Sequence, residues 1–471
     1  MNRVTLGLTE AVLKSGLKDG MRISLHHHLR LGDLVTGMVL KTLKGMGFRS
    51  LTLCASSLMG ESCDAVLKAV RAGVITNIET TGMKEPLSSA VLDGEVPHPV
   101  VFRTHGGRAR AIEAGDTPIH TAFLAVSSAD VSGNANGTYG PNRFGSLGYG
   151  LVDAEAARNV ILITDTLLEN LKENISIEGD DRCQVVEVGS LGDKNLIGGG
   201  SLRKSNRPVE KLIARKALEV LIASGCIQEG FSYQAGSGGV SLLVTGMVAD
   251  YMRRNGIVGS FASGGVTGGL VDLLGEGLFE KLFDVQSFDD AASLSLAENP
   301  GHFEMSASLY ASPDRPDCIA HKLDVMILSA TEVDLDFNLN SITGTDGRIL
   351  GALGGGPDTA EGAKVTIAVM PSFRGRIPTI NQRVNLICTP GKYVDIVITE
   401  RGVAVNPSRP DLEKQLKSGG IETLPIEKLM NLIYDLTGSP ELPRAMGRIV
   451  ALVEERRGEI LDVIRMNESA E

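Results

Sequence analysis

The amino-acid sequence contains the same pattern twice. The run LVTGMV at residues 34–39 recurs letter for letter at 243–248, and a D-x-x-x-N-x-N pattern begins at both Asp130 and Asp334. A third echo follows in the same order, GSLGYG from residue 145 against GALGGG from residue 351, so the three offsets are 209, 204 and 206 residues. This period matches one domain and is too long for a solenoid repeat. The sequence therefore predicts two related domains that face each other across a ligand cleft.

The bulk composition excludes several classes of protein. A net charge of -11 argues against a general nucleic-acid role, because phosphate binding needs basic clusters. The sequence has no run of 18 consecutive apolar residues, so no membrane span is expected, and the N-terminal residues do not resemble a signal peptide. The six cysteines are widely spaced without a C-x-x-C motif, which is typical of reduced core thiols rather than a metal site. We therefore expect a cytoplasmic enzyme that binds no nucleic acid, membrane or metal.

Short apolar runs alternate with helical patterns along most of the chain. Strands are expected at 22–25, 50–53, 74–78, 99–102, 121–126, 160–164, 259–262, 323–328, 365–370 and 394–399. Helices are expected at 34–43, 65–72, 206–224, 241–252 and 268–275. Because strands that alternate with helices form βαβ units, the predicted fold class is α/β with mainly parallel sheets.

A glycine tract at 198–200 marks the expected domain boundary, which divides the chain into residues 1–205 and 206–471. Past residue 409 the pattern changes to helices, including 426–436 and 446–457. The second domain is therefore expected to end in a helical tail from about residue 410, packed on that domain or on a partner.

A glycine-rich turn, QAGSGG at 234–239, stands directly before the helix predicted from residue 241. Its backbone N–H groups at a helix N-terminus would stabilise an anion, or the oxyanion of a thioester under attack. A tight turn without a ligand is an equally good interpretation. Two more glycine-rich runs follow, FASGGVTGG from residue 261 and LGGGPD from residue 353. Neither GxGxxG nor a P-loop occurs in the right setting, so NAD and ATP are not favoured.

Cationic groups follow two predicted strands in the first half. His26, His28 and Arg30 come after the first strand, and Arg108 lies in the run RTHGGRAR. Ligands of open α/β sheets bind at the C-terminal ends of strands, so a carboxylate-rich anion is one interpretation. A structural or solvated role is the alternative, and the three adjacent histidines do not specify a metal site, because alternate residues point to opposite faces.

Two further pairs of residues have open interpretations. Arg374 and Arg376 would clamp a carboxylate or phosphate, or lie on a charged surface loop. Asn134 and Asn136 are candidate ligand amides, although turn roles are favoured for a repeated feature.

Together these motifs resemble a known family. The duplicated halves, the QAGSGG turn, GGGPD at 354–358 and ITERGVA at 398–404 are similar to the coenzyme A-transferase superfamily. A closer resemblance, to its citrate lyase alpha-subunit family, rests on ISLHHHLR at 23–30, GGRARA at 106–111, GNANGT at 133–138, EGFSYQ at 229–234 and LYASP at 309–313.

The resemblance implies a two-domain coenzyme A-transferase-like fold and an acyl exchange. Acetyl carrier protein and citrate would give acetate and citryl carrier protein. The thioester would come from acetyl-CoA or from the coenzyme A-like prosthetic group of the carrier, with no cofactor held tightly by this chain. The implied partners are a small acyl carrier protein, which is the gamma subunit, the citryl lyase beta subunit, and further copies of the chain in a homo-oligomer.

One departure from the superfamily shapes the expected mechanism. Many coenzyme A-transferases carry a nucleophilic glutamate in the loop that corresponds to FASGGVTGG, and alignment on the following V-D-L puts Gly264 at its position. Citrate is therefore expected to attack the acetyl thioester directly, through a mixed anhydride. If an enzyme glutamate acts as the nucleophile instead, Glu332 is the candidate.

Residue roles follow from the glycine pattern and the resemblance. The candidates for catalysis are Gly236, Ser237, Gly238, Gly239, Gly264 and Glu332; for citrate, His26, His28, Arg30, Arg108, Arg374 and Arg376; for the thioester, Gln234, Gly265, Gly354, Gly355, Gly356, Asn134 and Asn136. Three alternatives stay open, namely citramalate as the acid, a sugar-phosphate isomerase, and a nucleotide-binding subunit without catalysis.

Overall fold

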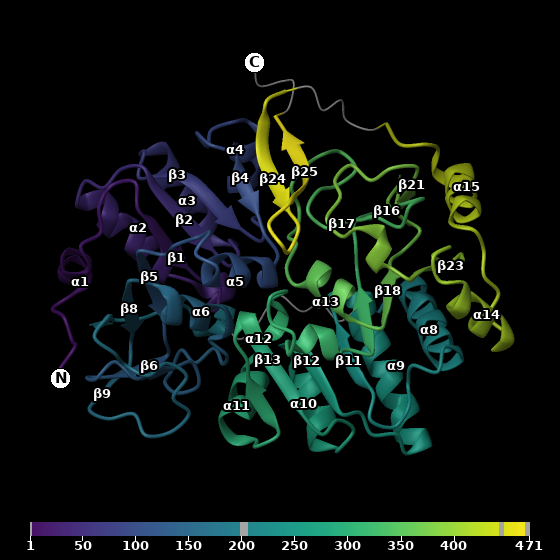
Figure 1. Ribbon diagram of the computed structural model, residues 1–471, viewed down its shortest axis with the longest axis horizontal. Helices are drawn as coiled ribbons and strands as arrows, with labels where there is room; N and C mark the ends of the chain where they lie inside the picture. Colours follow the sequence, from purple (N-terminus) through teal and green to yellow (C-terminus); the bar gives the residue numbers. More distant parts are fainter. Residues whose placement is uncertain (1, 198–205, 442–446, 467–471) are drawn as a thin grey trace.

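The computed structural model describes residues 2–197, 206–441 and 447–466. Two lobes lie side by side along the long axis, and each is built around a large β-sheet with helices packed against it (Figure 1). The α/β class with mainly parallel sheets is confirmed. The predicted boundary tract at 198–200 lies outside the described residues.

The first lobe holds a nine-stranded sheet in the order β10-β8-β5-β1-β2-β3-β4-β24-β25. Neighbouring strands are parallel except β24 and β25, which are antiparallel. The strands of the first half are β1 (Arg22–Leu25), β2 (Leu51–Ala55), β3 (Ile75–Thr80), β4 (Val100–Phe102), β5 (Thr121–Ala125), β6 (Ser128–Asp130), β7 (Ala135–Asn136), β8 (Asn159–Thr164), β9 (Leu167–Leu168) and β10 (Cys183–Glu187). The helices are α1 (Leu8–Ser15), η1 (Arg30–Gly32), α2 (Val35–Gly45), α3 (Glu61–Arg71), α4 (Leu87–Leu92), α5 (His105–Glu113), α6 (Gly148–Ala156) and α7 (Lys194–Ile197).

The second lobe holds an eight-stranded sheet in the order β14-β13-β12-β11-β15-β18-β22-β23, parallel except for β23. Its strands are β11 (Ser232–Ala235), β12 (Phe261–Val266), β13 (Leu282–Ser287), β14 (His302–Glu304), β15 (Val325–Leu328), β18 (Val365–Val369), β22 (Ile396–Thr399) and β23 (Gly402–Val405). Short strands outside this sheet are β16 (Glu332–Asp334), β17 (Leu339–Asn340), β19 (Phe373–Arg374), β20 (Ile377–Pro378) and β21 (Ile380–Asn381). The helices are α8 (Pro208–Ala223), α9 (Gly239–Asn255), α10 (Gly268–Gly275), α11 (Asp290–Glu298), α12 (Ala307–Ala311), η2 (Ile319–Lys322), α13 (Gly356–Gly362), η3 (Gly391–Tyr393), α14 (Pro410–Ser418) and α15 (Ile426–Thr437).

The two sheets repeat one topology. The order β10-β8-β5-β1-β2-β3-β4 in the first sheet matches β22-β18-β15-β11-β12-β13-β14 in the second, strand for strand. The LVTGMV run lies at the start of α2 in one lobe and within α9 in the other, and each of these helices follows the central strand β1 or β11. The duplication that three short motifs predicted therefore extends through both sheets.

The D-x-x-x-N-x-N pattern forms the same tight turn in each half. Asp130 accepts hydrogen bonds from the backbone and side chain of Asn134 at 3.0 and 2.9 Å. Asn134 accepts from the N–H of Gly179 at 3.0 Å, and Asn136 accepts from Ser128 Oγ at 2.8 Å. In the second copy Asp334 likewise accepts from the backbone and side chain of Asn338, and Asn338 accepts from the N–H of Gly391. Asn134 and Asn136 are thus held within the fold as turn residues and do not reach a ligand cavity.

The third repeated motif joins the lobes to each other. A Cβ on Gly148, in the first copy, would lie 2.0 Å from the carbonyl oxygen of Val285 in β13 of the second lobe. Ala352, in the second copy, lies so close to Gly82 after β3 of the first lobe that a Cβ on Gly82 would be 2.2 Å from its Cβ. Each copy therefore touches the equivalent strand of the opposite lobe, which is the reciprocal contact of a two-fold interface.

The end of the chain differs from the sequence-based prediction. The helix expected at 426–436 is present as α15, but the helix expected at 446–457 is wrong. Residues 449–465 form a hairpin of β24 (Ile449–Glu454) and β25 (Ile460–Arg465), and β24 pairs with β4 of the first lobe. A free sheet edge supplies backbone partners that a lone helix lacks, and this tertiary pairing overrides the helical periodicity. Figure 1 shows the hairpin between the two lobes.

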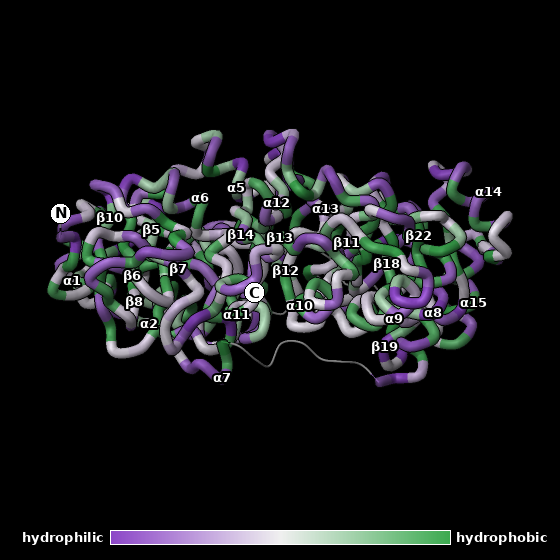
Figure 2. Tube along the Cα trace, turned by 90° about the horizontal axis from the view of Figure 1, so that it is seen from below, coloured by the Kyte–Doolittle hydropathy of each residue, from purple (hydrophilic) through white to green (hydrophobic). Residues whose placement is uncertain are grey.

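Hydrophobic and hydrophilic segments alternate through both lobes, as Figure 2 shows. In the described part of the chain no helix combines the length and apolar character needed to cross a membrane.

Candidate active site

A cavity of about 440 Å³, here called the interdomain cavity, lies between the lobes. Its lining includes the segments directly after β1, β2, β3, β4, β11 and β15. Parallel sheets bind ligands at this end of their strands, so the position agrees with the general rule. The polar or glycine residues that line it are His27, Arg30, Ser57, Thr81, His105, Tyr149, Gln234, Gly236, Ser237, Gly238, Gly265, Gln286, Tyr310, Ser329, Ser341, Gly354, Gly355, Gly356 and Thr389.

The three adjacent histidines divide between the cavity and the core. His27 lines the cavity, whereas His26 Nε2 lies 3.1 Å from Asp153 Oδ2 in the core. Arg108 donates two hydrogen bonds of 2.8 Å to the same carboxylate. Burial alone would raise the pKa of Asp153, but Arg108 and His26 hold it below its usual range. His26, Arg108 and the ring-stacked His28, which were expected to contact citrate, therefore form a buried cluster and do not line this cavity.

His27, His105 and Tyr149 form an aromatic wall of the cavity. The His105 and Tyr149 ring centroids are 4.2 Å apart, and those of His27 and Tyr149 are 5.1 Å apart. Ser56 fixes the His27 ring through a 2.6 Å contact between its Oγ and Nδ1. Burial lowers the pKa of both histidines, that of His105 to about 3 with further help from Arg108. Both rings are therefore neutral in the empty cavity.

Arg30, one of the residues expected to bind citrate, lines the cavity and brings a positive charge to it. Its backbone has φ +52°, a conformation that is uncommon for a residue with a side chain and that recurs at functional sites. The guanidinium carbon lies 4.5 Å from the centroid of the Phe288 ring, a favourable cation–π contact. Burial lowers the pKa of Arg30 to about 10, so the side chain stays protonated at neutral pH.

The QAGSGG turn connects β11 to α9 as predicted. The N–H of Gly236 is already used, because it donates to the carbonyl of Ile327 at 2.9 Å. It is therefore not the oxyanion donor that the sequence suggested. Gly238 precedes the first residue of α9, and the N–H groups of Gly238 and Gly239 make no hydrogen bond to another described residue. These two N–H groups remain as donors at a helix N-terminus.

Gly264 lies at the position where a superfamily glutamate was expected, in a segment that is part of β12 rather than a loop. Its φ is +104°, which disfavours a side chain, and a Cβ there would lie 2.8 Å from Cδ of Gln234. Gln234 cannot simply move aside, because its amide donates to Tyr310 Oη and accepts from Ser263 Oγ, both at 2.8 Å. The glutamine side chain therefore occupies the space that a residue at 264 would need.

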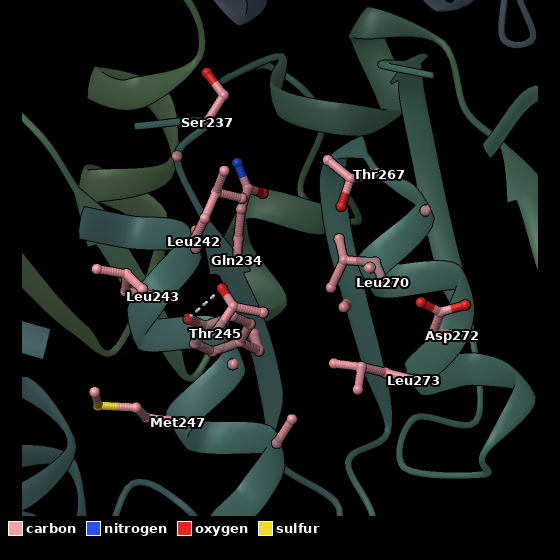
Figure 3. A pocket seen from close by; sticks show the side chains of 18 of the residues that line it. Gln234, Ser237, Leu242, Leu243, Thr245, Met247, Thr267, Leu270, Asp272 and Leu273 are labelled. Carbon is pink, nitrogen blue, oxygen red and sulfur yellow. Dashed lines mark hydrogen bonds between the residues drawn. The ribbon is translucent and has the colours of Figure 1, made fainter. Parts of the chain in front are cut away.

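A second and larger space of about 950 Å³, here called the α9–α10 groove, runs between these two helices (Figure 3). Leu242, Leu243 and Met247 lie on one side, and Leu270 and Leu273 on the other, with Gln234 at one end. The groove and the interdomain cavity adjoin, because both are lined by Gln234, Ala235, Gly236, Ser237, Gly265 and Phe288.

The GGG stretch at 354–356 lines the cavity next to His105 of the aromatic wall. Gly354 accepts a hydrogen bond from the N–H of His105 at 3.0 Å, which ties the two lobes together at the site. A Cβ on Gly355 would lie 2.3 Å from Tyr310 Oη. Glycine is required there because the tyrosine that holds Gln234 passes so close to the backbone.

Three further predicted site residues also lie away from both spaces. Arg374 and Arg376 are exposed, and Arg374 donates to the carbonyls of Thr331 and Ala330. Glu332 is fully buried, where it accepts hydrogen bonds from Asn340 and Asn381 at 2.8 Å. Neither cavity is lined by these side chains.

Sequence reasoning missed His27, His105, Tyr149, Tyr310, Gln286 and Phe288. The first two had a signal, since His27 is the middle residue of the histidine run and His105 lies in RTHGGRAR. The alternation of side chains indicated that His27 points away from His26 and His28. It did not indicate which of the two sides lines the cavity. Tyr149 and Tyr310 stand within the motifs GSLGYG and LYASP, but nothing in those motifs indicates contact with a ligand cavity. Gln286 and Phe288 carry no such signal.

Within the described residues no group of three or more histidine, cysteine, aspartate or glutamate side chains is arranged to hold a metal ion. All six cysteines are free thiols, five of them buried, and none lines the interdomain cavity.

The two repeated α/β lobes have a coenzyme A-transferase-like fold. A 4-hydroxybutyrate CoA-transferase from Porphyromonas gingivalis is similar in fold, with a TM-score of 0.56 and 16% identity over 92% of this chain and 97% of that chain.

Much closer similarities exist. The family model described as "Citrate lyase, alpha subunit (CitF)" matches residues 1–467. A citrate lyase alpha chain from Haemophilus influenzae is 44% identical over 462 residues, which are 98% of this chain and 92% of the relative. A structure described as an alpha subunit of citrate lyase from Streptococcus mutans, in complex with citrate, has a TM-score of 0.96 and 42% identity over 99% of this chain and 92% of that chain. The chain belongs to the citrate lyase alpha-subunit family, an enzyme family of the transferase type. This confirms the resemblance that the motifs indicated.

Proposed function

We propose that this chain exchanges the acetyl group of an acetyl carrier thioester for citrate, releasing acetate and a citryl thioester. Citrate occupies the interdomain cavity, and the prosthetic arm of the carrier occupies the α9–α10 groove. The observation that carries the proposal is that the two spaces adjoin at Gln234 and at the N-terminus of α9. An acid and a thioester bound in them meet at a point with polar donors.

The interdomain cavity suits a small carboxylic acid. It offers the cation of Arg30 and neutral donors on a wall that water reaches little. The relative from Streptococcus mutans that shares 42% identity with the chain was solved in complex with citrate. Citramalate has one carboxylate fewer, so the two acids are compared directly in any exchange assay.

The α9–α10 groove suits a long, thin arm. A Cβ on Gly246, in α9, would meet no atom within 4 Å, so the helix surface there is open. The matching glycine of the first copy, Gly37 in α2, faces Ala65 of α3, whose Cβ is 4.0 Å from the ideal Cβ position. The first copy thus packs the two helices together, whereas the second copy leaves a groove between their counterparts.

The chemistry proceeds in two balanced steps. A citrate carboxylate oxygen attacks the acetyl carbonyl, and the thiolate leaves, which gives a mixed anhydride of citric and acetic acids. The thiolate then attacks the citryl carbonyl, and acetate leaves with the bridging oxygen that came from citrate. The N–H groups of Gly238 and Gly239 stabilise the oxyanion in each step, and the bound acid and arm displace water from the anhydride.

Oxygen labelling tests the direct attack. Acetyl thioester is mixed with excess protein and citrate labelled with ¹⁸O in its carboxyl groups, and the acetate of the first turnover is analysed by mass spectrometry. We expect one labelled oxygen in that acetate. Unlabelled acetate would mean that an enzyme carboxylate supplied the oxygen, and recovery of a glutamate as its alcohol after borohydride treatment would contradict direct attack in the same way.

A side chain that fills the α9–α10 groove should weaken the use of the thioester but not that of citrate. Gly246→Leu places an isobutyl group in the open groove. Leucine favours a helix more than glycine does, so the fold should be retained. We expect the KM for the acetyl thioester to rise roughly tenfold or more, a loss of about 1.4 kcal/mol, with the KM for citrate unchanged. Steady-state kinetics with each substrate varied in turn measure both values.

Gly275→Leu is the matched control, because Gly275 ends α10 with open space around it and does not line the groove. An equal effect of both substitutions on the thioester KM would remove the arm from the groove.

The proposal also covers the partner proteins and the cellular compartment. A small acyl carrier protein would deliver the arm, a citryl lyase subunit would cleave the product, and the assembly with further copies of this chain would work in the cytoplasm. Co-purification of the chain with a carrier protein tests the first of these.

A further inference from the structure

We propose that His27 and His105 take up protons when citrate enters the interdomain cavity, so that two imidazolium groups join Arg30 in balancing its charge. This inference rests on the proposed function, because it concerns the same citrate site.

The cavity is short of positive charge. Among the described residues that line it, Arg30 is the sole lysine or arginine, and no carboxylate is present. Citrate carries three negative charges near neutral pH. A buried charge is costly unless it is paired, so one arginine leaves two carboxylates without a counter-charge. The two lining histidines are the groups that can supply one.

The geometry makes the two imidazoles available as a pair. Their rings are stacked with centroids 6.1 Å apart and an interplanar angle of 11°. Both residues are buried, at 9% and 8% exposure, yet both line the cavity. His105 Nδ1 has no hydrogen-bond partner among the described residues, so it is free to act as a proton acceptor. Ser56 and the Gly354 carbonyl hold the two residues in place through the contacts described above.

The surroundings explain why the pair is neutral without a ligand. Burial is the largest cause of the lowered pKa of His27, and the nearby groups of His105, His28, Arg30 and His26 lower it further. His105 is faced by Arg108 of its own helix, which adds to the effect of burial on its pKa. The other ionisable groups nearby are Tyr149 of α6 and Asp358 of α13, which accepts a hydrogen bond from the N–H of Gly106.

Bound carboxylates reverse this balance. An opposite charge within a few ångströms favours the protonated imidazole and raises its pKa, and it screens the repulsion between the two rings. The complex therefore binds more protons than the empty protein over the pH range between the two pKa values. Across that range the affinity for citrate should weaken as pH rises, by up to about tenfold per pH unit for each proton taken up.

Calorimetry measures the proton count directly. Citrate is titrated into the full chain at pH 7.5 in PIPES and in Tris, whose heats of ionisation differ, and the difference in binding heat gives the protons taken up. We expect uptake of between one and two protons per citrate. Citrate binding without proton uptake would overturn this inference alone, whereas the absence of citrate binding would overturn the proposed function and the inference with it.

Substitutions locate the protons. His27→Gln and His105→Gln keep a polar side chain of similar size but cannot take up a proton, so each should lower the uptake. His98→Gln, at an exposed position, is the matched control and should leave it unchanged. If both cavity variants bind citrate with the wild-type uptake, the proton goes to citrate itself and the histidine pair has no such role.

Discussion

Replacing Arg456 with alanine should lower the free energy of unfolding by about 3–5 kcal/mol, because it removes one partner of a buried ion pair. The Arg456 side chain is 1% exposed, and its guanidinium donates to the carbonyl of Ala311 at 2.8 Å. It also pairs with Asp358 and Glu361 of α13 at 3.5 and 3.4 Å. Truncation would leave the fully buried Asp358 without its cation. Chemical denaturation followed by circular dichroism measures the loss.

The position of Arg456 links this loss to activity. It lies in the turn between β24 and β25, which belong to the first sheet, and reaches α12 and α13 of the second lobe. These helices carry Tyr310 and Gly356 of the interdomain cavity. The alanine variant should therefore also lower kcat in the exchange assay, even where it remains folded.

The destabilisation should depend on pH in a definite direction. Burial raises the pKa of Asp358 to about 6, although Arg456 opposes the rise. A carboxyl group with a raised folded-state pKa favours folding below its unfolded value near 4, and this contribution is lost as pH rises through the folded value. Without Arg456 the folded value rises further. The variant should therefore be closer to wild type at pH 5, where Asp358 is protonated, than at pH 7.5.

The adjacent arginine provides the control. Arg457 pairs with Glu361 at 2.6 Å, but its side chain is 50% exposed, so Arg457→Ala should cost no more than about 1 kcal/mol. Equal losses from the two substitutions, or a loss from Arg456→Ala that does not change with pH, would contradict the role assigned to the buried pair.

The fold was predictable because both copies of the duplicated unit carry local sequence patterns that indicate their strands and helices. Each half carries the strand and helix periodicity of βαβ units, and LVTGMV follows the central strand in both. The hairpin at 449–465 was not predictable in the same way. Its apolar residues suit a helix or a strand, and what decides between them is the free edge of β4, some 350 residues earlier in the chain.

The candidate site was predicted in part, and for a physical reason. The glycine turn and Arg30 stand directly after central strands, where local sequence is enough to place them at the cavity. The outer histidines of the triple run were assigned to citrate, but Asp153 and Arg108 hold His26 in the core. That buried carboxylate lies on α6, far away in sequence, so no pattern around residue 26 could reveal which face was internal.

Gln234→Ala should reduce kcat for acyl exchange by roughly 10²–10³-fold, the usual effect of removing a donor from a developing oxyanion. The Gln234 amide lies where the interdomain cavity and the α9–α10 groove adjoin. One amide hydrogen is used by Tyr310 at 2.8 Å, and an amide carries two. The second hydrogen is available to the thioester carbonyl. Rapid-quench measurement of acetate release gives the rate of the chemical step.

Gln234→Glu separates donation from packing. Glutamate keeps the length of the side chain and can still accept from Ser263 and from the hydroxyl of Tyr310, so the space above Gly264 stays filled. An ionised carboxylate has no hydrogen to donate, and its charge opposes both citrate and the oxyanion. If Gln234 acts as a donor, the glutamate variant should be at least as impaired as the alanine variant, although its side chain fills the same space. Wild-type rates in the glutamate variant would reduce Gln234 to a residue that packs over Gly264, and would leave the N–H groups of Gly238 and Gly239 as the oxyanion donors.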